Sequence, residues 1–263
     1  MKVLLTLIPL LLGTIESKGD SAQANAYCQP QLCDLGQMHV ACEYYSKLKA
    51  ENQSSCPTKE TRLVYFTIIK DKVLELHNER RYRLANGNDS RLPEAARLVT
   101  MQWSPELAIL AEFNAHMCQL EEDDCRNSAQ FPHAGQNVFV VNMNRRVPKE
   151  EMIKLYPQLL ANATEAWWSE SDNITAAEIK RFPCEKNKPK GFSHFANMAV
   201  EGNSHVGCAG VRYVIDNITY FKLTCNYARA PVCGQPIYQA TQGCQAGKNS
   251  QFSALCSPKE LFL

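Results

Sequence analysis

The sequence lacks an apolar segment long enough to cross a membrane, and it lacks a strong net charge. Its amino-terminal apolar run, Val3 to Leu12, is about half the roughly 20 residues that a membrane-spanning helix requires. The formal net charge is +1, which gives no general electrostatic attraction to nucleic acid or to an anionic membrane. We therefore expect neither a transmembrane anchor nor a nucleic-acid partner.

Several catalytic and metal-binding patterns are also missing. There is no C-x-x-C pair, so a cysteine-based zinc site is not expected. There is no G-x-S-x-G nucleophile elbow and no H-E-x-x-H motif, two frequent signatures of hydrolases. The chain also has no internal repeat and no low-complexity tract. These absences leave a single globular domain with extensions as the simplest organisation.

The amino terminus is typical of a secretory signal peptide. Met1-Lys2 precede the apolar run, and small and polar residues follow it, which is the order of regions in a signal peptide. The alternative is a buried first strand or helix. Cleavage after Ser17 and cleavage after Ala24 both fit the sequence, so residues 1–17 are predicted to be removed, and the cut can fall as late as residue 24. We expect a secreted, extracellular protein.

Cysteines and glycosylation sequons agree with export. All twelve cysteines lie after the signal peptide, and an even number in an exported chain favours disulfides because the secretory route is oxidising. Each N-glycosylation sequon predicts an exposed asparagine. The sequons begin at Asn52, Asn88, Asn162, Asn173 and Asn217.

The first helical pattern runs from about Thr61 to Ala85. Val73, Leu76 and Tyr82 are placed toward a core, while charged residues interrupt the apolar spacing. Gly87 stands where a helix is expected to stop. This segment is predicted to be an amphipathic helix.

The second and third helical patterns follow. Ser104 can cap the free amides of a helix that starts at Pro105, and apolar residues recur at helical spacing from Leu107 to Met117. A third helix is predicted between Lys149 and Ser171, with an interruption at Pro157 because proline removes a backbone donor.

A β-hairpin is predicted near the end of the chain. Two β-rich runs, 211–215 and 218–222, flank Asp216-Asn217, and both of these residue types tolerate the positive φ of a two-residue turn. With this turn, opposed residues have numbers that sum to 433. Cys208 and Cys225 then face each other at a distance that a disulfide can bridge.

The ends of the chain read as irregular segments held by cysteines. Residues 25–57 hold four cysteines and show little periodicity, and residues 229–263 are rich in Gly, Pro and Cys. Between them, residues 58–228 have helices before strands, which indicates an α+β domain with a sheet covered by helices.

Seven short motifs follow one another in a fixed order along the chain. They are Leu76-His77-Asn78-Glu79-Arg80-Arg81, Gln102-Trp103-Ser104-Pro105-Glu106-Leu107-Ala108, Gly135-Gln136-Asn137-Val138, Trp167-Trp168-Ser169-Glu170, Ser193-His194-Phe195, Val206-Gly207-Cys208-Ala209 and Cys225-Asn226-Tyr227. Together, in this order, they resemble the CAP superfamily of cysteine-rich secretory, antigen 5 and pathogenesis-related proteins. The amino-terminal cysteines and the short tail resemble the insect antigen 5-related branch.

The resemblance implies a three-layer αβα sandwich with a central antiparallel sheet, plus disulfide-stapled extensions at both ends. It also implies a disulfide pattern. The implied pairs are Cys28–Cys42, Cys33–Cys125, Cys56–Cys118 and Cys208–Cys225. With these given, the remaining cysteines are assigned as Cys244–Cys256, by their spacing, and Cys184–Cys233.

Many members of the superfamily carry two histidines and two glutamates in a central cleft, sometimes with a divalent metal. In this sequence Glu170 and His194 match two of the four positions. Gln136 replaces the other glutamate, and Glu122 stands at the position of the first histidine. One histidine with one glutamate is a poor metal site, so no metal or cofactor is expected. Glu122 offers an oxygen ligand, but the run 121–124 is interpreted as a solvated acidic loop.

His116 and His133 lie near this loop in the sequence but match no family position. We interpret them as ordinary helix and loop residues. The degenerate cleft and the absence of an unpaired nucleophile favour a protein that is not an enzyme.

The resemblance implies a secreted, non-enzymatic binding protein. Its partners would be a lipid or other small apolar ligand, or a host or extracellular protein. Apolar residues between Ile153 and Trp168 either line a channel for such a ligand or pack on the sheet, and we favour packing.

Two other functions are carried as alternatives. The first is a metal-dependent hydrolase that uses the residual Glu170/His194 cleft. The second is an integrin-type adhesion ligand through Lys18-Gly19-Asp20, which cleavage after Ala24 would remove.

Overall fold

The computed structural model describes residues 26–51, 56, 60–64, 66–88, 91–118, 120–184 and 191–262. The predicted signal peptide, the Lys18-Gly19-Asp20 tripeptide and the sequon residue Asn52 lie outside these residues. The elements, in chain order, are η1 (Pro30–Leu32), α2 (Val40–Glu51), β1 (Arg62–Val64), α3 (Phe66–Ala85), β2 (Gln102–Trp103), α4 (Pro105–His116), β3 (Gly135–Asn142), α5 (Lys149–Ser169), η2 (Glu170–Asn173), α6 (Ala176–Lys180), α7 (Ser193–Ala199), β4 (His205–Ile215) and β5 (Ile218–Tyr227).

The predicted hairpin forms the centre of the sheet. Ile215 pairs with Ile218 and Cys208 pairs with Cys225, which is the register expected from the sequence. Asp216 and Asn217 have φ values of 48° and 61°, the positive values that a tight two-residue turn requires. The prediction is confirmed because turn and strand signals agreed locally.

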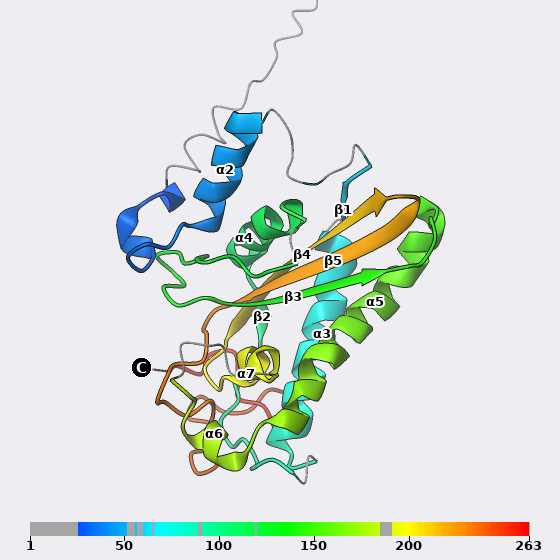
Figure 1. The fold of residues 1–263 in the computed structure, drawn as a ribbon. Helices are drawn as coiled ribbons and strands as arrows, with labels where there is room; N and C mark the ends of the chain where they lie inside the picture. Colours follow the sequence, from blue (N-terminus) through cyan, green and yellow to red (C-terminus); the bar gives the residue numbers. More distant parts are fainter. Residues whose placement is uncertain are drawn as a thin grey trace, which may run out of the picture.

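The sheet is antiparallel apart from one short pairing. Its strand order is β1-β4-β5-β3, and β2 pairs with β4 in parallel over two residue pairs. Helices cover both faces (Figure 1): α4 and α2 lie on one side, and α3, α5 and α7 lie on the other. This is the αβα sandwich that the resemblance implies.

Along the central strands, successive side chains point to opposite faces of the sheet and pack against the helices on each face. Val206 and Cys208 belong to the large core shared with α3 and α5, whereas Ala209 and Val211 pack with Ala111 of α4. Gly207 is needed where α4 begins, because a Cβ there would lie 2.3 Å from the backbone nitrogen of Ala108. The amino-terminal end of α4 can therefore rest directly on β4.

Two segments differ from the sequence prediction. Residues 62–64 form strand β1, so the first long helix begins at Phe66 rather than near Thr61. Val64 is buried, and β1 pairs with β4.

The amino-terminal segment contains the 12-residue helix α2, although it was expected to be irregular. Its start is buried, where Val40 packs with Leu110 and Met117.

Pro157 lies inside α5 without interrupting it, so the predicted break is wrong. Pro157 is on the exposed side of the helix. Tyr156, Leu159 and Leu160 beside it are buried in the core, and their packing compensates for one missing backbone hydrogen bond.

The carboxy-terminal tail is irregular, as predicted, but it completes the main core. Ile237, Tyr238 and Leu255 are at most 2% exposed and belong to the same cluster as α3 and α5. The backbone of Cys256 bonds to Leu98 and Thr100. Side chains after residue 228 therefore share the main core of the sandwich.

Six disulfides link the described residues, and no described cysteine is free. They are the six pairs given in the sequence analysis, namely Cys28–Cys42, Cys33–Cys125, Cys56–Cys118, Cys184–Cys233, Cys208–Cys225 and Cys244–Cys256.

Candidate functional site: a cleft without a metal-ligand set

His194 and Glu170, two of the residues predicted to form a cleft, are in direct contact. Glu170 follows α5 and His194 lies in the first turn of α7. The Oε1 atom of Glu170 lies 2.6 Å from Nδ1 of His194, and its Oε2 accepts hydrogen bonds from the backbone nitrogens of His194 and Phe195 at 2.8 and 3.3 Å. One carboxylate therefore orients the imidazole and also caps the start of α7.

Glu122 approaches the other side of the same imidazole. Its Oε1 atom lies 3.9 Å from Nε2 of His194. The side chains of His194, Glu170 and Glu122 are between 18% and 28% exposed. The structure thus brings three of the four predicted cleft residues together, and carboxylates flank the imidazole on both sides.

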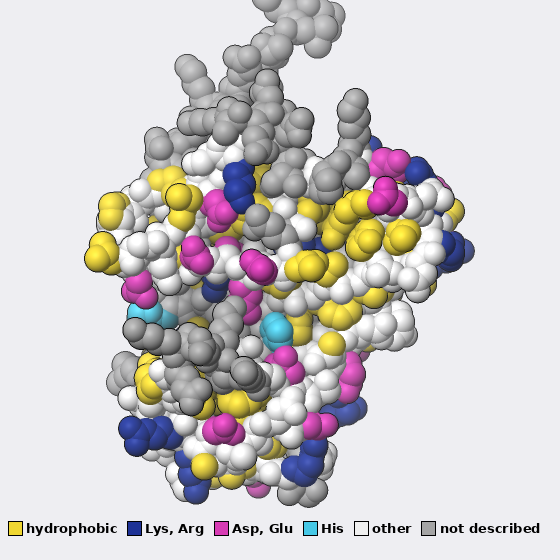
Figure 2. All heavy atoms as spheres, in the orientation of Figure 1, with side chains coloured by type: hydrophobic (Ala, Val, Ile, Leu, Met, Phe, Trp, Pro, Cys, Tyr) yellow, Lys and Arg dark blue, Asp and Glu magenta, His cyan; other side chains and the backbone are white. Residues whose placement is uncertain are grey.

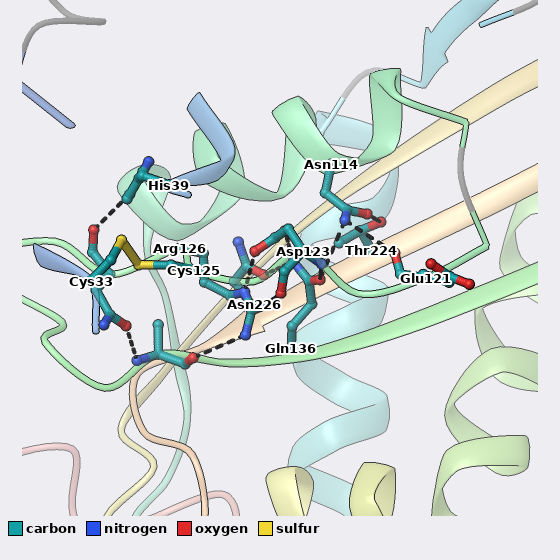
Figure 3. Close-up of polar contacts among 12 residues, drawn as sticks. Cys33, His39, Asn114, Glu121, Asp123, Cys125, Arg126, Gln136, Thr224 and Asn226 are labelled. Carbon is teal, nitrogen blue, oxygen red and sulfur yellow. Dashed lines mark hydrogen bonds and ion pairs between the residues drawn. A yellow bond between two sulfur atoms is a disulfide. The ribbon is translucent and has the colours of Figure 1, made fainter. Parts of the chain in front are cut away.

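Gln136, the fourth predicted residue, belongs to a buried network (Figure 3). Its amide nitrogen donates to Asp123 Oδ2 at 2.6 Å and to Asn226 Oδ1 at 2.8 Å. Its carbonyl oxygen accepts from the backbone nitrogen of Asp123 at 3.0 Å and from Asn114 at 3.4 Å. The amide of Gln136 is therefore engaged with the loop that follows α4, with α4 itself and with β5.

The interpretation of residues 121–124 as a solvated acidic loop is wrong for Asp123. This residue is 8% exposed and its carboxylate lies 2.6 Å from Nε of Arg126. A buried carboxylate is tolerated when it is paired and hydrogen-bonded, and Arg126 and Gln136 supply these partners. Glu121 and Asp124 are exposed, so the interpretation holds for them.

Behind the cleft is a polar network that sequence reasoning missed. Asn137 donates to the carbonyl of His194 at 3.0 Å and to the hydroxyl of Tyr227 at 3.1 Å, and that hydroxyl lies 2.9 Å from Nε2 of His77. Burial lowers the pKa of His77 to about 4, although its bond to the Val73 carbonyl opposes the shift. The imidazole is therefore neutral near pH 7. The signal that the sequence offered for His77 was its position in one of the quoted motifs.

Lys222 is a second residue that sequence reasoning missed. It is fully buried in β5 and donates to the carbonyl of Asn114, at the end of α4, at 2.8 Å. Burial lowers its pKa to about 7, while Asp123 opposes the shift. Nothing in the alternation of 218–222 distinguishes it from an outward-facing lysine.

The donor set does not fit a metal ion. Nδ1 of His194 is occupied by Glu170, Glu122 lies 3.9 Å from Nε2, and the side chain at 136 is an amide turned toward Asp123. Within the ranges that the structure describes, no three His, Cys, Asp or Glu side chains are grouped as metal ligands. One imidazole nitrogen and one carboxylate fall short of the three or four ligands typical of zinc.

The remaining predicted residues lie outside the cleft group. His116 is 3.5 Å from Glu112 at the end of α4, and His133 is exposed in the loop before β3. The four described sequon asparagines, at 88, 162, 173 and 217, are all exposed. Their glycosylation stays a prediction.

The sandwich and the altered cleft correspond to one class of protein. The chain belongs to the CAP family, the cysteine-rich secretory protein family, whose model matches residues 74–227. Within this family it is similar to insect allergens. It is 32% identical to Venom allergen-1 of Aedes albopictus over 91% of this chain and 90% of that protein. It is 30% identical to the Antigen 5 like allergen Cul n 1 of Culicoides nubeculosus over 71% of this chain and 83% of that protein.

Solved structures show the same fold at lower identity. The structure of BmVAL-1 superposes with a TM-score of 0.57 at 21% identity and covers 78% of this chain and 99% of its own. The crystal structure of NaASP2 with Zn²⁺ gives 0.55 at 21% identity, with 77% and 100% covered. Among the described residues, no helix combines the length and the apolar character needed to cross a membrane.

Proposed function

We propose that this chain is a secreted, non-enzymatic binding protein whose ligand is a small hydrophobic molecule. The observation that carries the proposal is an apolar groove of about 280 Å³ at the edge of the sheet. The groove lies between β1, β2 and α4, on the opposite side of β4 from β5. Its lining residues are Leu63, Val64, Lys70, Trp103, Pro105, Ala108, Ile109, Glu112, Cys208 and Ala209.

A gap in strand pairing creates this groove. β1 pairs with residues 210–212 of β4, and β2 pairs with residues 205 and 206. In the described part of the chain, residues 207–209 have no strand partner on that side. α4 covers the gap, and Ile109, which is 37% exposed, stands at its rim.

The register also gives the groove polar groups. Ile215 and Ile218 flank the two-residue turn and form a hydrogen-bonded pair, so every second residue of β4 bonds to β5. Cys208 is one of the intervening residues, and its N–H and C=O point away from β5, into the gap. Its Cα lies 4.1 Å from that of Cys225, which agrees with the shorter spacing of a non-hydrogen-bonded pair. A ligand with an apolar body and one hydrogen-bonding group suits this surface.

The other location considered, a channel along α5, has less support. Leu160 and Trp167 are at most 2% exposed, and Leu159 is 6% exposed. These side chains pack on the sheet and on α3, so they form core rather than an open surface. This agrees with the interpretation favoured from the sequence.

The groove is tested with a neutral apolar dye. Nile red should bind to the deglycosylated protein and be displaced by 1-decanol. Ile109→Glu, which places a charge at the rim, should weaken dye binding at least tenfold. The matched control is Ile153→Glu, because Ile153 is also an exposed helix residue, at 45%, but lies on α5. Equal binding to both variants would contradict the assignment of the groove.

Native mass spectrometry before and after organic extraction tests the ligand class in the secreted protein. An extractable apolar adduct would support the proposal. A clean mass, together with no dye binding, would favour contact with a host or extracellular protein instead. Sequencing of the mature amino terminus tests both secretion and the retention of Lys18-Gly19-Asp20.

A hydrolase is the second candidate, because the 2.6 Å contact between Glu170 and His194 has the geometry of an oriented base. No described cysteine is free to act as a nucleophile. Ester or peptide hydrolysis that disappears in His194→Ala and Glu170→Gln would establish this candidate over the binding protein.

A further inference from the structure

A second cavity, of about 440 Å³, lies at the other end of the sheet from the hairpin turn. Three segments form it: the loop 130–133 before β3, the start of β4 at Ser204-His205, and residues 228–232 after β5. It shares no lining residue with the groove beside β1. The residues of the cleft at His194 do not line it either.

Backbone hydrogen bonds hold the walls of this cavity. Ser128 and Phe131 exchange two backbone bonds of 3.0 and 3.1 Å. The backbone nitrogen of Ala230 donates to His133 at 2.7 Å, and that of Arg229 donates to the side chain of Asn203 at 3.0 Å. The cavity is therefore preorganised, which reduces the entropic cost of binding.

The lining of the cavity contains no carboxylate. Its basic side chains are His133, His205 and Arg229. The cavity between α3 and α5 differs, because there Arg80 and Arg91 are paired with Glu165 and Asp172.

Arg229 and His205 are each positioned by a neighbour. The guanidinium of Arg229 donates to the carbonyl of Phe262 at 2.8 Å, which uses one of its five donors. Nδ1 of His205 lies 2.9 Å from the Ser204 hydroxyl. Burial lowers the pKa of His205, so Arg229 supplies the fixed positive charge near pH 7. Glu201, which does not line the cavity, interacts electrostatically with Arg229.

The rest of the lining is apolar and partly aromatic. Phe131 is 5% exposed, and its ring centroid lies 5.8 Å from that of His205. Pro132, Ala228 and Val232 complete the apolar walls. A ligand that satisfies both parts needs a flat or branched apolar body and a negative group.

We infer that this cavity binds a small organic anion, an aromatic carboxylate, with its carboxylate on Arg229 and its ring against Phe131 and His205. Arginine suits this role because its planar fork matches a carboxylate with two parallel hydrogen bonds. The inference concerns a site separate from the hydrophobic groove and does not depend on it.

The test compares 2-naphthoate with 2-naphthamide, which has the same ring system but no charge. Isothermal titration calorimetry of the full mature protein should give one site for naphthoate and at least tenfold weaker binding of the amide. Arg229→Gln should reduce naphthoate affinity at least tenfold. The control Arg83→Gln removes the same charge from the cavity between α3 and α5 and should leave the affinity unchanged.

Three results would overturn the inference: equal binding of acid and amide, no effect of Arg229→Gln, or no naphthoate binding at millimolar concentration. Arg229 also contacts the end of the chain, so His205→Ala provides a second variant, which removes one aromatic wall and keeps Arg229. It should weaken naphthoate binding while leaving the unfolding midpoint close to that of the parent. Ile109→Glu, in the other groove, should not affect naphthoate binding.

Discussion

Gln136 carries an amide where its surroundings would not accept a second carboxylate. Asp123 Oδ2 lies 2.6 Å from the amide nitrogen, and Asp123 is already held by Arg126. Because Gln136 is 1% exposed, a charge placed there would have no water to solvate it. The residue at 136 and the buried Asp123 are therefore a matched pair, and a change at one requires a change at the other.

Gln136→Glu should destabilise the protein by about 3 kcal/mol near pH 7, because it removes two buried donors and sets two carboxylates against each other. The new carboxyl would have a folded-state pKa above its unfolded value of about 4.3. The deficit is therefore present above the folded pKa and shrinks as the pH falls toward about 4.

Guanidinium unfolding at pH 7 and pH 4, each compared with the parent protein at the same pH, measures this effect. Gln158→Glu on the exposed side of α5 is the control and should change stability little at either pH. A Gln136→Glu deficit that stays constant with pH would show that lost hydrogen bonds, rather than charge repulsion, dominate.

Elements differ in how well the sequence predicted them. The hairpin was predicted to the residue because Asp216-Asn217, the β-rich runs and the two cysteines all gave the same register. The start of α4 was predicted equally well, since Ser104 caps it and accepts a bond from the nitrogen of Leu107 at 3.2 Å. α2 was missed because its packing contacts are with α4, which is distant in sequence.

The candidate site was predicted only in part. Glu170 and His194 were found because they stand in motifs, and the structure places them in contact. The role of Asp123 could not be predicted, because a run of four acids gives no sign of which one turns inward toward Arg126. Lys222 was missed because a single buried charge leaves the strand pattern unchanged.

Pro157 gives a test at the scale of the element. Pro157→Ala restores the backbone donor in the middle of α5 and improves helix propensity, so it should stabilise the protein by about 1–2 kcal/mol after allowance for a more flexible unfolded chain. Chemical unfolding measures the change. Pro132→Ala, outside any helix, is the control and should not stabilise the protein. An unchanged or lower stability for Pro157→Ala would mean that α5 has adapted its curvature to the proline.

The whole molecule combines a sandwich with two extensions that contribute to the structure in different ways. The amino-terminal extension adds a helix outside α4, joined to the rest by Cys33–Cys125. The carboxy-terminal extension places its apolar side chains inside the main core, and the buried Glu260 accepts backbone bonds from Gln245 and Ala246. The sequence alone suggested disulfides as the force holding this tail, whereas the structure adds core packing.

Core packing and disulfide cross-linking predict different effects of tail substitutions on stability, and a substitution at Ile237 distinguishes between them. It is 1% exposed and lies outside the loop closed by Cys244–Cys256. If the tail is part of the core, Ile237→Ala should cost about 2–5 kcal/mol even with every disulfide intact. The exposed tail residue Val232, at 55%, is the control, and Val232→Ala should cost less than about 0.5 kcal/mol. Guanidinium unfolding under oxidising conditions measures both variants.

An equally small effect at the two positions would mean that the disulfides alone secure the tail, and a chain ended after residue 230 should then keep the stability of the sandwich. The packing contacts of Ile237, Tyr238 and Leu255 lead us to expect instead that such a chain loses a large share of the 5–15 kcal/mol typical of a folded domain.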